Sequence, residues 1–335
     1  MRQNNIFLML LKVFFFSSIL VATSAVRAEL KVVTTIKPLH SLIANVMDGV
    51  GEPALIIEGS TSPHSFTLKP SHAKLLEEAD IIFWVGESIE TFMERPLESI
   101  VKNAEVVEFM EVESINKLKF REESIFDDHD DHGHDDHDDH DDHDDHDDHD
   151  DHDDHDDHSG HDHHGHAHGE FDAHIWLDPM NAKEMVHEIA HELGDLDPAN
   201  KNKYEANAQA TIQALDQLVN DIEKGINKDA KFVVFHDAYQ YFEERFGVRA
   251  AGALTLNTDV LPGAKQIADI QDVIKDRGIK CIFSEPQFNP KIITTIAEDM
   301  NIKTGVFDPL GANIDSNKDL YFKLIQNLGN ELKGC

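Results

Sequence analysis

The feature that most restricts the fold is an alternation of short apolar runs with segments of helical spacing, which occurs twice along the chain. In the first block, β-rich runs at 30–36, 54–57, 81–85 and 106–109 alternate with helical patterns such as 39–47 and 70–79. In the second block, runs at 232–235, 250–254, 280–283 and 304–307 alternate with helical patterns at 264–276, 290–299 and 318–333. Strands that alternate with helices form βαβ units around parallel sheets. We therefore expect an α/β protein with two lobes, each built on a parallel sheet.

A long helical pattern lies between the two blocks. After Pro198 no proline occurs as far as Ile226, and apolar residues recur at helical spacing. A helix of about 28 residues would be about 42 Å long at 1.5 Å per residue. We expect a linking helix at 198–227 between an N-terminal lobe, 29–197, and a C-terminal lobe, 228–335.

An acidic, histidine-rich insert interrupts the N-terminal lobe. Residues 127–168 hold 21 Asp and 16 of the 23 His, and the unit Asp-Asp-His repeats without a break over 135–158. Removing those 21 charges from the formal charge of −36 leaves −15, so the extreme charge belongs to the insert. Such a segment cannot bury apolar surface, and we expect it to be disordered. With no basic footprint, the chain is not expected to bind nucleic acid.

The insert is either a solvated acidic linker or a collector of divalent metal. The density of imidazoles favours the second interpretation, with many weak sites, because ordering a flexible chain around each ion costs entropy. The candidate ligands are His129, His132, His134, His137, His140, His143, His146, His149, His152, His155, His158, His161, His163, His164, His166 and His168.

The N-terminus has the pattern of a cleavable secretory signal at 1–28. Arg2 and Lys12 supply positive charge, an apolar region covers 6–21, and Val26-Arg27-Ala28 places small residues before Glu29. A membrane anchor is the alternative, but the apolar run is short for a bilayer span. We expect the mature chain to be an exported, soluble monomer.

Three histidines and one carboxylate follow, or nearly follow, predicted strands. His64 lies in the turn after 54–57, His174 opens the sequence His-Ile-Trp-Leu-Asp-Pro, His236 follows 232–235, and Asp308 follows 304–307. Ligands of open parallel sheets bind outside the carboxyl ends of strands. Three imidazoles and one oxygen ligand suit zinc. Each histidine taken singly is more often structural, and the set alone does not separate a metal receptor from a hydrolytic zinc enzyme.

Seven motifs give the mature chain a resemblance to a known family. They are Thr35–His40 (TIKPLH), Pro63–Phe66 with Leu68–Ser71, Ala79–Gly86 (ADIIFWVG), His174–Pro179 (HIWLDP), Phe235–Tyr239 (FHDAY), Ser284–Phe288 (SEPQF) and Phe307–Gly311 (FDPLG). In order and spacing they resemble the metal-binding solute-binding proteins of bacterial ABC uptake systems, in particular the zinc branch of the ZnuA type. A His-rich insert before HIWLDP is also typical of that branch.

The resemblance implies two lobes joined by one rigid helix, with metal in the cleft. It maps zinc ligands onto His64, His174 and His236, and it matches Asp308 to a fourth carboxylate position that water or another acidic residue can also fill. Manganese members of the wider family carry a carboxylate at the position of His236, so an imidazole there favours zinc. The implied function is a periplasmic receptor, not an enzyme, that delivers Zn²⁺ to an ABC permease in the inner membrane.

A rival motif is His187-Glu188-Ile189-Ala190-His191, a literal H-E-x-x-H. On a helix the two imidazoles could bind zinc with Glu188 as general base, which is the pattern of a metalloprotease. The alternative is a solvent-facing helix whose core stripe contains Met185, Ile189 and Leu193. An exported zinc protease, or an extracellular metal-storage or adhesion protein, therefore stays open as an alternative function.

The chain has two cysteines, Cys281 in a predicted strand and Cys335 at the end of the sequence. They could be unrelated thiols. Export and the resemblance both favour a disulfide, which would close a loop of about 55 residues and contribute on the order of 4 kcal/mol.

Overall fold

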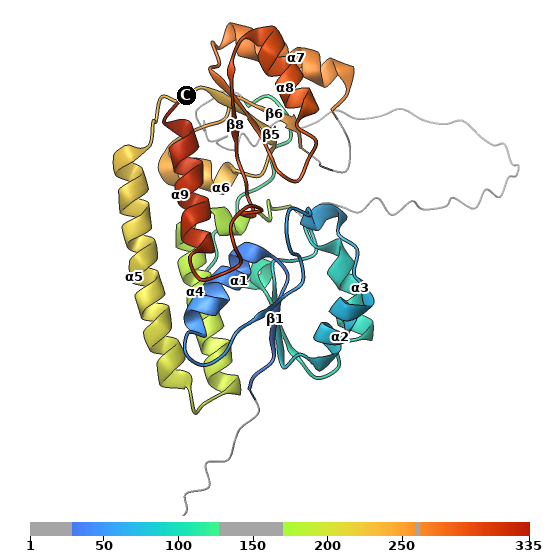
Figure 1. The fold of residues 1–335 in the computed structure, drawn as a ribbon, viewed down its shortest axis with the longest axis vertical. Helices are drawn as coiled ribbons and strands as arrows, with labels where there is room; N and C mark the ends of the chain where they lie inside the picture. The colour runs from blue at the N-terminus through green and yellow to red at the C-terminus, as the bar shows by residue number, and fades with distance from the viewer. Residues whose placement is uncertain (1–28, 127–169, 257, 259–261) are drawn as a thin grey trace, which may run out of the picture.

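The computed structural model describes residues 29–126, 170–256, 258 and 262–335. Within them the chain forms two four-stranded sheets, in which every pair of neighbouring strands is parallel. In Figure 1 the sheet that contains β1 lies in the lower part of the molecule and the sheet that contains β5 in the upper part. The predicted fold class is confirmed. The predicted signal segment at 1–28 and the insert at 127–168 lie outside the described residues.

The strands are short, and most of their central residues are buried on both faces, as is usual for parallel sheets. The first sheet has the order β2-β1-β3-β4, formed by β1 (Val32–Thr34), β2 (Ala54–Leu55), β3 (Ile81–Trp84) and β4 (Glu105–Glu108). The second sheet has the order β6-β5-β7-β8, formed by β5 (Phe232–His236), β6 (Ala253–Thr255), β7 (Cys281–Ser284) and β8 (Lys303–Val306).

Helices connect the strands and cover the sheets. They are α1 (Lys37–Val46), α2 (Pro70–Glu78), α3 (Glu94–Ser99), α4 (Pro179–Leu196), α5 (Lys201–Gly225), α6 (Gln240–Phe246), α7 (Ala264–Asp276), α8 (Lys291–Met300) and α9 (Leu320–Leu332). Two 3₁₀ turns, η1 (Pro63–Ser65) and η4 (Ile175–Leu177), are important for the site below. No helix in the described part of the chain combines the length and apolarity needed to cross a membrane.

The long helix predicted between the two blocks is α5, which has 25 residues. It begins at Lys201 rather than at Pro198, because residues 198–200 form the turn after α4 and Asn200 Nδ2 donates to Asp197 at 2.6 Å. Helix α5 packs along α4, and Figure 1 shows it running beside both halves of the molecule.

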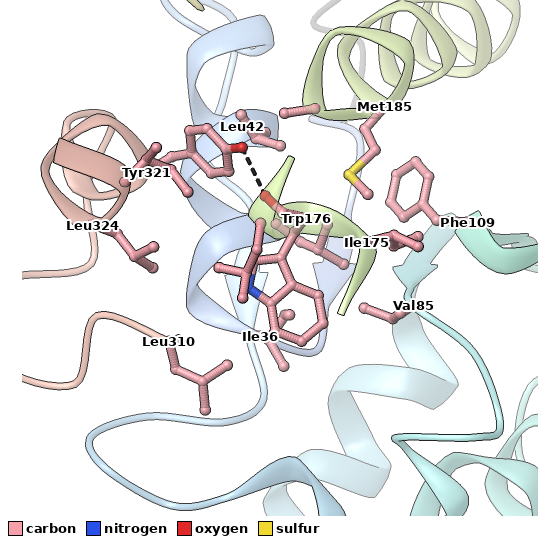
Figure 2. Packing of buried hydrophobic residues seen from close by; sticks show 14 of the residues in the cluster. Ile36, Leu42, Val85, Phe109, Ile175, Trp176, Met185, Leu310, Tyr321 and Leu324 are labelled. Carbon is pink, nitrogen blue, oxygen red and sulfur yellow. Dashed lines mark hydrogen bonds between the residues drawn. The ribbon is translucent and has the colours of Figure 1, made fainter. Parts of the chain in front are cut away.

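The last helix, α9, packs against α1 and α5. Figure 2 shows Tyr321 of α9 beside Leu42 of α1, and the Tyr321 hydroxyl donates to the Trp176 carbonyl at 2.7 Å. The apolar pattern of α9 requires a buried face but does not specify the surface that buries it. Helix α9 therefore joins the two halves.

The disulfide between Cys281 and Cys335 is present, which confirms the pairing. It links β7 to the residue at the end of the sequence, beyond α9. By the chain-entropy model, closing a loop of 54 residues of sequence separation contributes about 4 kcal/mol.

Candidate metal site

His64, His174 and His236 come together in the structure. Each offers one ring nitrogen, and these atoms lie within 4.8 Å of one another. His64 is in η1 after β2, His174 caps the start of η4, and His236 is the last residue of β5. No other such group of three or more His, Cys, Asp or Glu ligands was found among the described residues. This convergence is what a metal ion requires.

The spacing of two imidazoles fits a zinc ion. The Nε2 atoms of His174 and His236 are 3.4 Å apart. In a tetrahedral shell with Zn–N bonds of about 2.0–2.1 Å, two nitrogens are separated by about 3.3–3.4 Å. The ring centroid of His64 lies 5.6 Å from that of His174 and 5.9 Å from that of His236.

A buried carboxylate orients His174. Asp172 Oδ1 lies 2.7 Å from His174 Nδ1 and also accepts the backbone N–H of His174 at 2.9 Å. Because an ionised carboxylate only accepts, Nδ1 carries the proton and Nε2 presents its lone pair to the cluster. Both side chains are buried.

Glu285 does the same for His236. Its Oε1 lies 2.6 Å from His236 Nδ1 and accepts the His236 backbone N–H at 3.3 Å. Burial lowers the pKa of His236, but the attraction of Glu285 outweighs it, so the pKa is raised above its ordinary value. Carboxylate–histidine pairs of this kind support metal ligands in many proteins.

Sequence reasoning did not assign a role to Asp172 or Glu285. Signals for both were available, because Asp172 precedes His174 by two residues and Glu285 directly follows β7. Each carboxylate contacts the Nδ1 atom of one histidine of the cluster.

A small cavity surrounds the cluster. Its volume is about 10 Å³, which is enough for one water-sized particle. The residues before His64 set the backbone that carries it into the cavity wall. Ser62 Oγ accepts the His64 backbone N–H at 3.3 Å, and Pro63 begins η1. Both halves contribute to the wall, which contains Ser62, Pro63, Ile89, Trp176, Gln287, Phe288, Pro309 and Leu310. The site has room for one ion and little solvent.

Asp308 is not part of the group of converging ligands. Its Oδ1 accepts from Gln287 Nε2 at 3.0 Å and from the Leu310 N–H at 3.1 Å, and its Oδ2 accepts from the Ala312 N–H at 2.6 Å. The carboxylate therefore organises the loop after β8. Its predicted role as a fourth ligand stays a prediction.

The rival motif lies on α4, away from the cluster. His187 and His191 are exposed, and His191 Nδ1 lies 3.1 Å from Glu192 Oε1. The predicted core stripe of Met185, Ile189 and Leu193 is fully buried. The helix thus buries its apolar face and turns the H-E-x-x-H imidazoles outward. The histidines of the insert lie outside the described residues.

Known proteins resemble the chain over most of its length. A protein of Brucella abortus (strain 2308) named "High-affinity zinc uptake system protein ZnuA" is 50% identical over 306 residues, which cover 91% of each chain. The protein of the same name from Yersinia pestis is 32% identical over 321 residues and 95% of each chain. A solved structure described as "Crystal structure of ZnuA" matches with a TM-score of 0.68 at 20% identity, over 90% of this chain and 98% of that one.

These relatives are zinc-uptake proteins, and they do not support the metalloprotease alternative. The structural likeness, at 20% identity, shows the shared fold. A family model described as "ZnuA: Zinc-uptake complex component A periplasmic" matches residues 32–335. The protein therefore belongs to the ZnuA family of zinc-uptake components.

Proposed function

We propose that this protein is a periplasmic receptor that captures Zn²⁺ and delivers it to an ABC permease in the inner membrane. The observation that carries the proposal is the convergence of His64, His174 and His236 on one small cavity. The names of its relatives, which are zinc-uptake proteins, support the same function. The receptor binds its cargo and catalyses no reaction.

The donor set supports zinc as the cargo. Three imidazoles are borderline-soft ligands that suit Zn²⁺ better than the harder ion Mn²⁺. Two of them are oriented by buried carboxylates, whose negative charge also favours a divalent cation. A fourth position is filled by water or by Asp308, whose loop borders the cavity through Pro309 and Leu310.

Residues 1–28 act as a cleaved export signal, so that Glu29 begins the mature chain. Residues 127–168 collect zinc weakly outside the cavity. The lobes are formed by 29–197 and 228–335, and the helix at 198–227 links them.

Calorimetric titration of two proteins tests the site. The mature chain, residues 29–335, should bind one zinc ion tightly and several weakly. A variant that lacks 127–168 should keep the tight site and lose the weak ones. Loss of the tight site on deletion would place the receptor function in the insert, and His64→Ala in the shortened protein should abolish tight binding.

A second variant distinguishes the receptor function from the metalloprotease alternative. His187→Ala combined with His191→Ala should leave the tight zinc affinity unchanged, because both side chains are exposed on α4. If the double variant loses the tight ion, the helix is the site and the receptor assignment is wrong. Delivery is tested by zinc-limited growth of cells in which this chain replaces the resident zinc receptor; His64→Ala should not support growth.

A further inference from the structure

A basic cavity lies at the amino ends of β5 and β7. It has a volume of about 580 Å³, and its charged lining consists of Lys228, Asp229, Lys231, Arg249, Asp276 and Arg277. Four positive and two negative groups give it an excess of positive charge. Among the described residues, the side chains of Lys228 and Arg249 form no hydrogen bond or ion pair.

The chain reaches the rim of this cavity just before the acidic insert. Arg277 Nη1 donates to the carbonyl of Phe126, the last described residue before the insert, at 2.5 Å. The Phe126 N–H donates to the carbonyl of Ala251, which also lines the cavity, at 3.1 Å. The Arg121 guanidinium lies 4.1 Å from the centre of the Phe126 ring. Phe126 is therefore held at the rim by three contacts.

The residues just before Phe126 pack closely against the edge of the second sheet. Ile125 forms an antiparallel bridge with Gly252, next to β6. A Cβ at Gly252 would lie 2.7 Å from the Ser124 carbonyl oxygen, so a larger residue would push the segment away. Backbone contacts thus fix the position of residues 124–126, which directly precede the insert.

The next five residues are Asp127, Asp128, His129, Asp130 and Asp131. They carry four carboxylates, and an extended chain of five residues reaches at most about 17 Å. We propose that the basic cavity is the docking site of this acidic segment of the same chain. The sign of the charge on each side, and the attachment of the segment at the rim, both support this occupant.

The docked segment would hold the start of the insert away from the metal site. The cavity includes Phe232, the first residue of β5, and His236 is the last. Four steps along a strand separate them by about 13 Å. Attraction between exposed charges is screened over about 8–10 Å at ordinary ionic strength, so docking should weaken as salt is added.

Spin labelling of the mature chain tests the proposal. A nitroxide on Gly133→Cys, two residues beyond Asp131, reports how freely the start of the insert moves, and the native cysteines are not labelled because they form a disulfide. Charge reversal with Lys228→Glu and Arg249→Glu should reduce the immobilised fraction of the label at least twofold. Changing the four aspartates at 127, 128, 130 and 131 to Asn should have the same effect, as should 0.5 M NaCl.

Lys102→Glu combined with Lys291→Glu is the matched control. It makes the same change in net charge at two exposed lysines elsewhere, and the spectrum should not change. Circular dichroism and an unchanged tight zinc affinity establish that each variant is folded. A spectrum that is insensitive to both the cavity and the aspartate substitutions would overturn the proposal, whether or not salt changes it.

Discussion

Glu285 determines which ring nitrogen of His236 faces the cluster, so its removal should weaken zinc binding. Glu285→Ala leaves His236 Nδ1 without its acceptor and removes a buried negative charge. We expect a loss of about 10–100-fold in zinc affinity, the usual effect of removing such a partner. Glu285→Gln keeps an acceptor and should lose less. Competition with a chromogenic chelator measures both, with Glu298→Ala, exposed on α8, as the control. Wild-type affinity in Glu285→Ala would contradict this role.

The three histidine ligands could be predicted from the sequence, but the carboxylates that orient two of them could not. His64, His174 and His236 each follow a strand or open a motif, and the structure brings them together. Glu285 is 49 residues from His236 in sequence. It reaches His236 because β7 lies next to β5 in the sheet, and the order of parallel strands depends on packing between distant segments.

Glu90 is a buried carboxyl group whose charge should reduce stability at neutral pH. Burial raises its pKa from 4.5 to about 7, although its Oε2 accepts from the Val85 and Gly86 N–H groups. Between these values the folded protein binds more protons than the unfolded chain, so stability falls as pH rises from about 4.5 to about 7. The lost stability is about 3 kcal/mol.

Glu90→Gln removes this titration. Relative to the natural protein, the variant should gain stability at pH 8 and gain much less at pH 5. Urea unfolding at the two values measures the difference, and Glu205→Gln, exposed on α5, should show none. An equal effect of Glu90→Gln at both pH values would show that Glu90 does not titrate in this range.

At the scale of elements, sequence periodicity predicted where strands and helices lie along the chain better than it predicted which elements pack together. In the part of the chain that the structure describes, the apolar runs form the strands of two parallel sheets, because central strands buried on both faces give a strong local signal. The partners of α9 could not be predicted from its periodicity, because a buried face can pack on any apolar surface. Here that surface is formed by α1 and α5.

Lys37, the first residue of α1, fastens this helix to the loop that follows β8. Its Nζ donates to the carbonyls of Gly311, Ala312 and Ile314 at 2.7, 3.1 and 2.6 Å. Lys37→Met should leave the Ala312 and Ile314 carbonyls without a donor, while the Gly311 carbonyl keeps the Ile314 N–H, and it should cost about 3 kcal/mol of unfolding free energy. Zinc affinity should also fall, because the same loop places Leu310 against the cavity.

Urea unfolding and chelator competition measure the two effects of Lys37→Met. Lys323→Met, exposed on α9, is the control and should change neither. A variant with natural stability would show that the Ala312 and Ile314 carbonyls find other donors and that Lys37 does not hold the loop.

At the scale of the whole molecule, the site depends on how the two halves are joined. His64 follows a strand of the first sheet, whereas His236 ends a strand of the second. Buried hydrogen bonds connect the two halves near the site. Trp176 Nε1 donates to the Pro309 carbonyl at 2.8 Å, and Tyr321 donates to the Trp176 carbonyl (Figure 2). Such support from buried groups is what keeps metal ligands in place.

Protons and zinc should compete for this assembled site. Glu285 raises the pKa of His236 above 6.5 against the opposing effect of burial. In the metal-free protein, protonated His236 stabilises the fold fully below the unfolded pKa, and this contribution is lost as pH rises through the folded pKa. Zinc requires neutral imidazoles, so its contribution has the opposite dependence on pH.

The rise in melting temperature caused by zinc should therefore grow between pH 5.5 and pH 8. Each proton that zinc must displace lowers the affinity about tenfold per pH unit below the folded pKa, or about 1.4 kcal/mol. Calorimetry of the protein lacking 127–168, at fixed free zinc, measures the shift without the histidines of the insert. Glu285→Gln should move the midpoint of this dependence to lower pH, because it removes the charge that raises the pKa of His236. A zinc-induced shift that does not vary with pH would mean that the ion does not bind through titrating imidazoles.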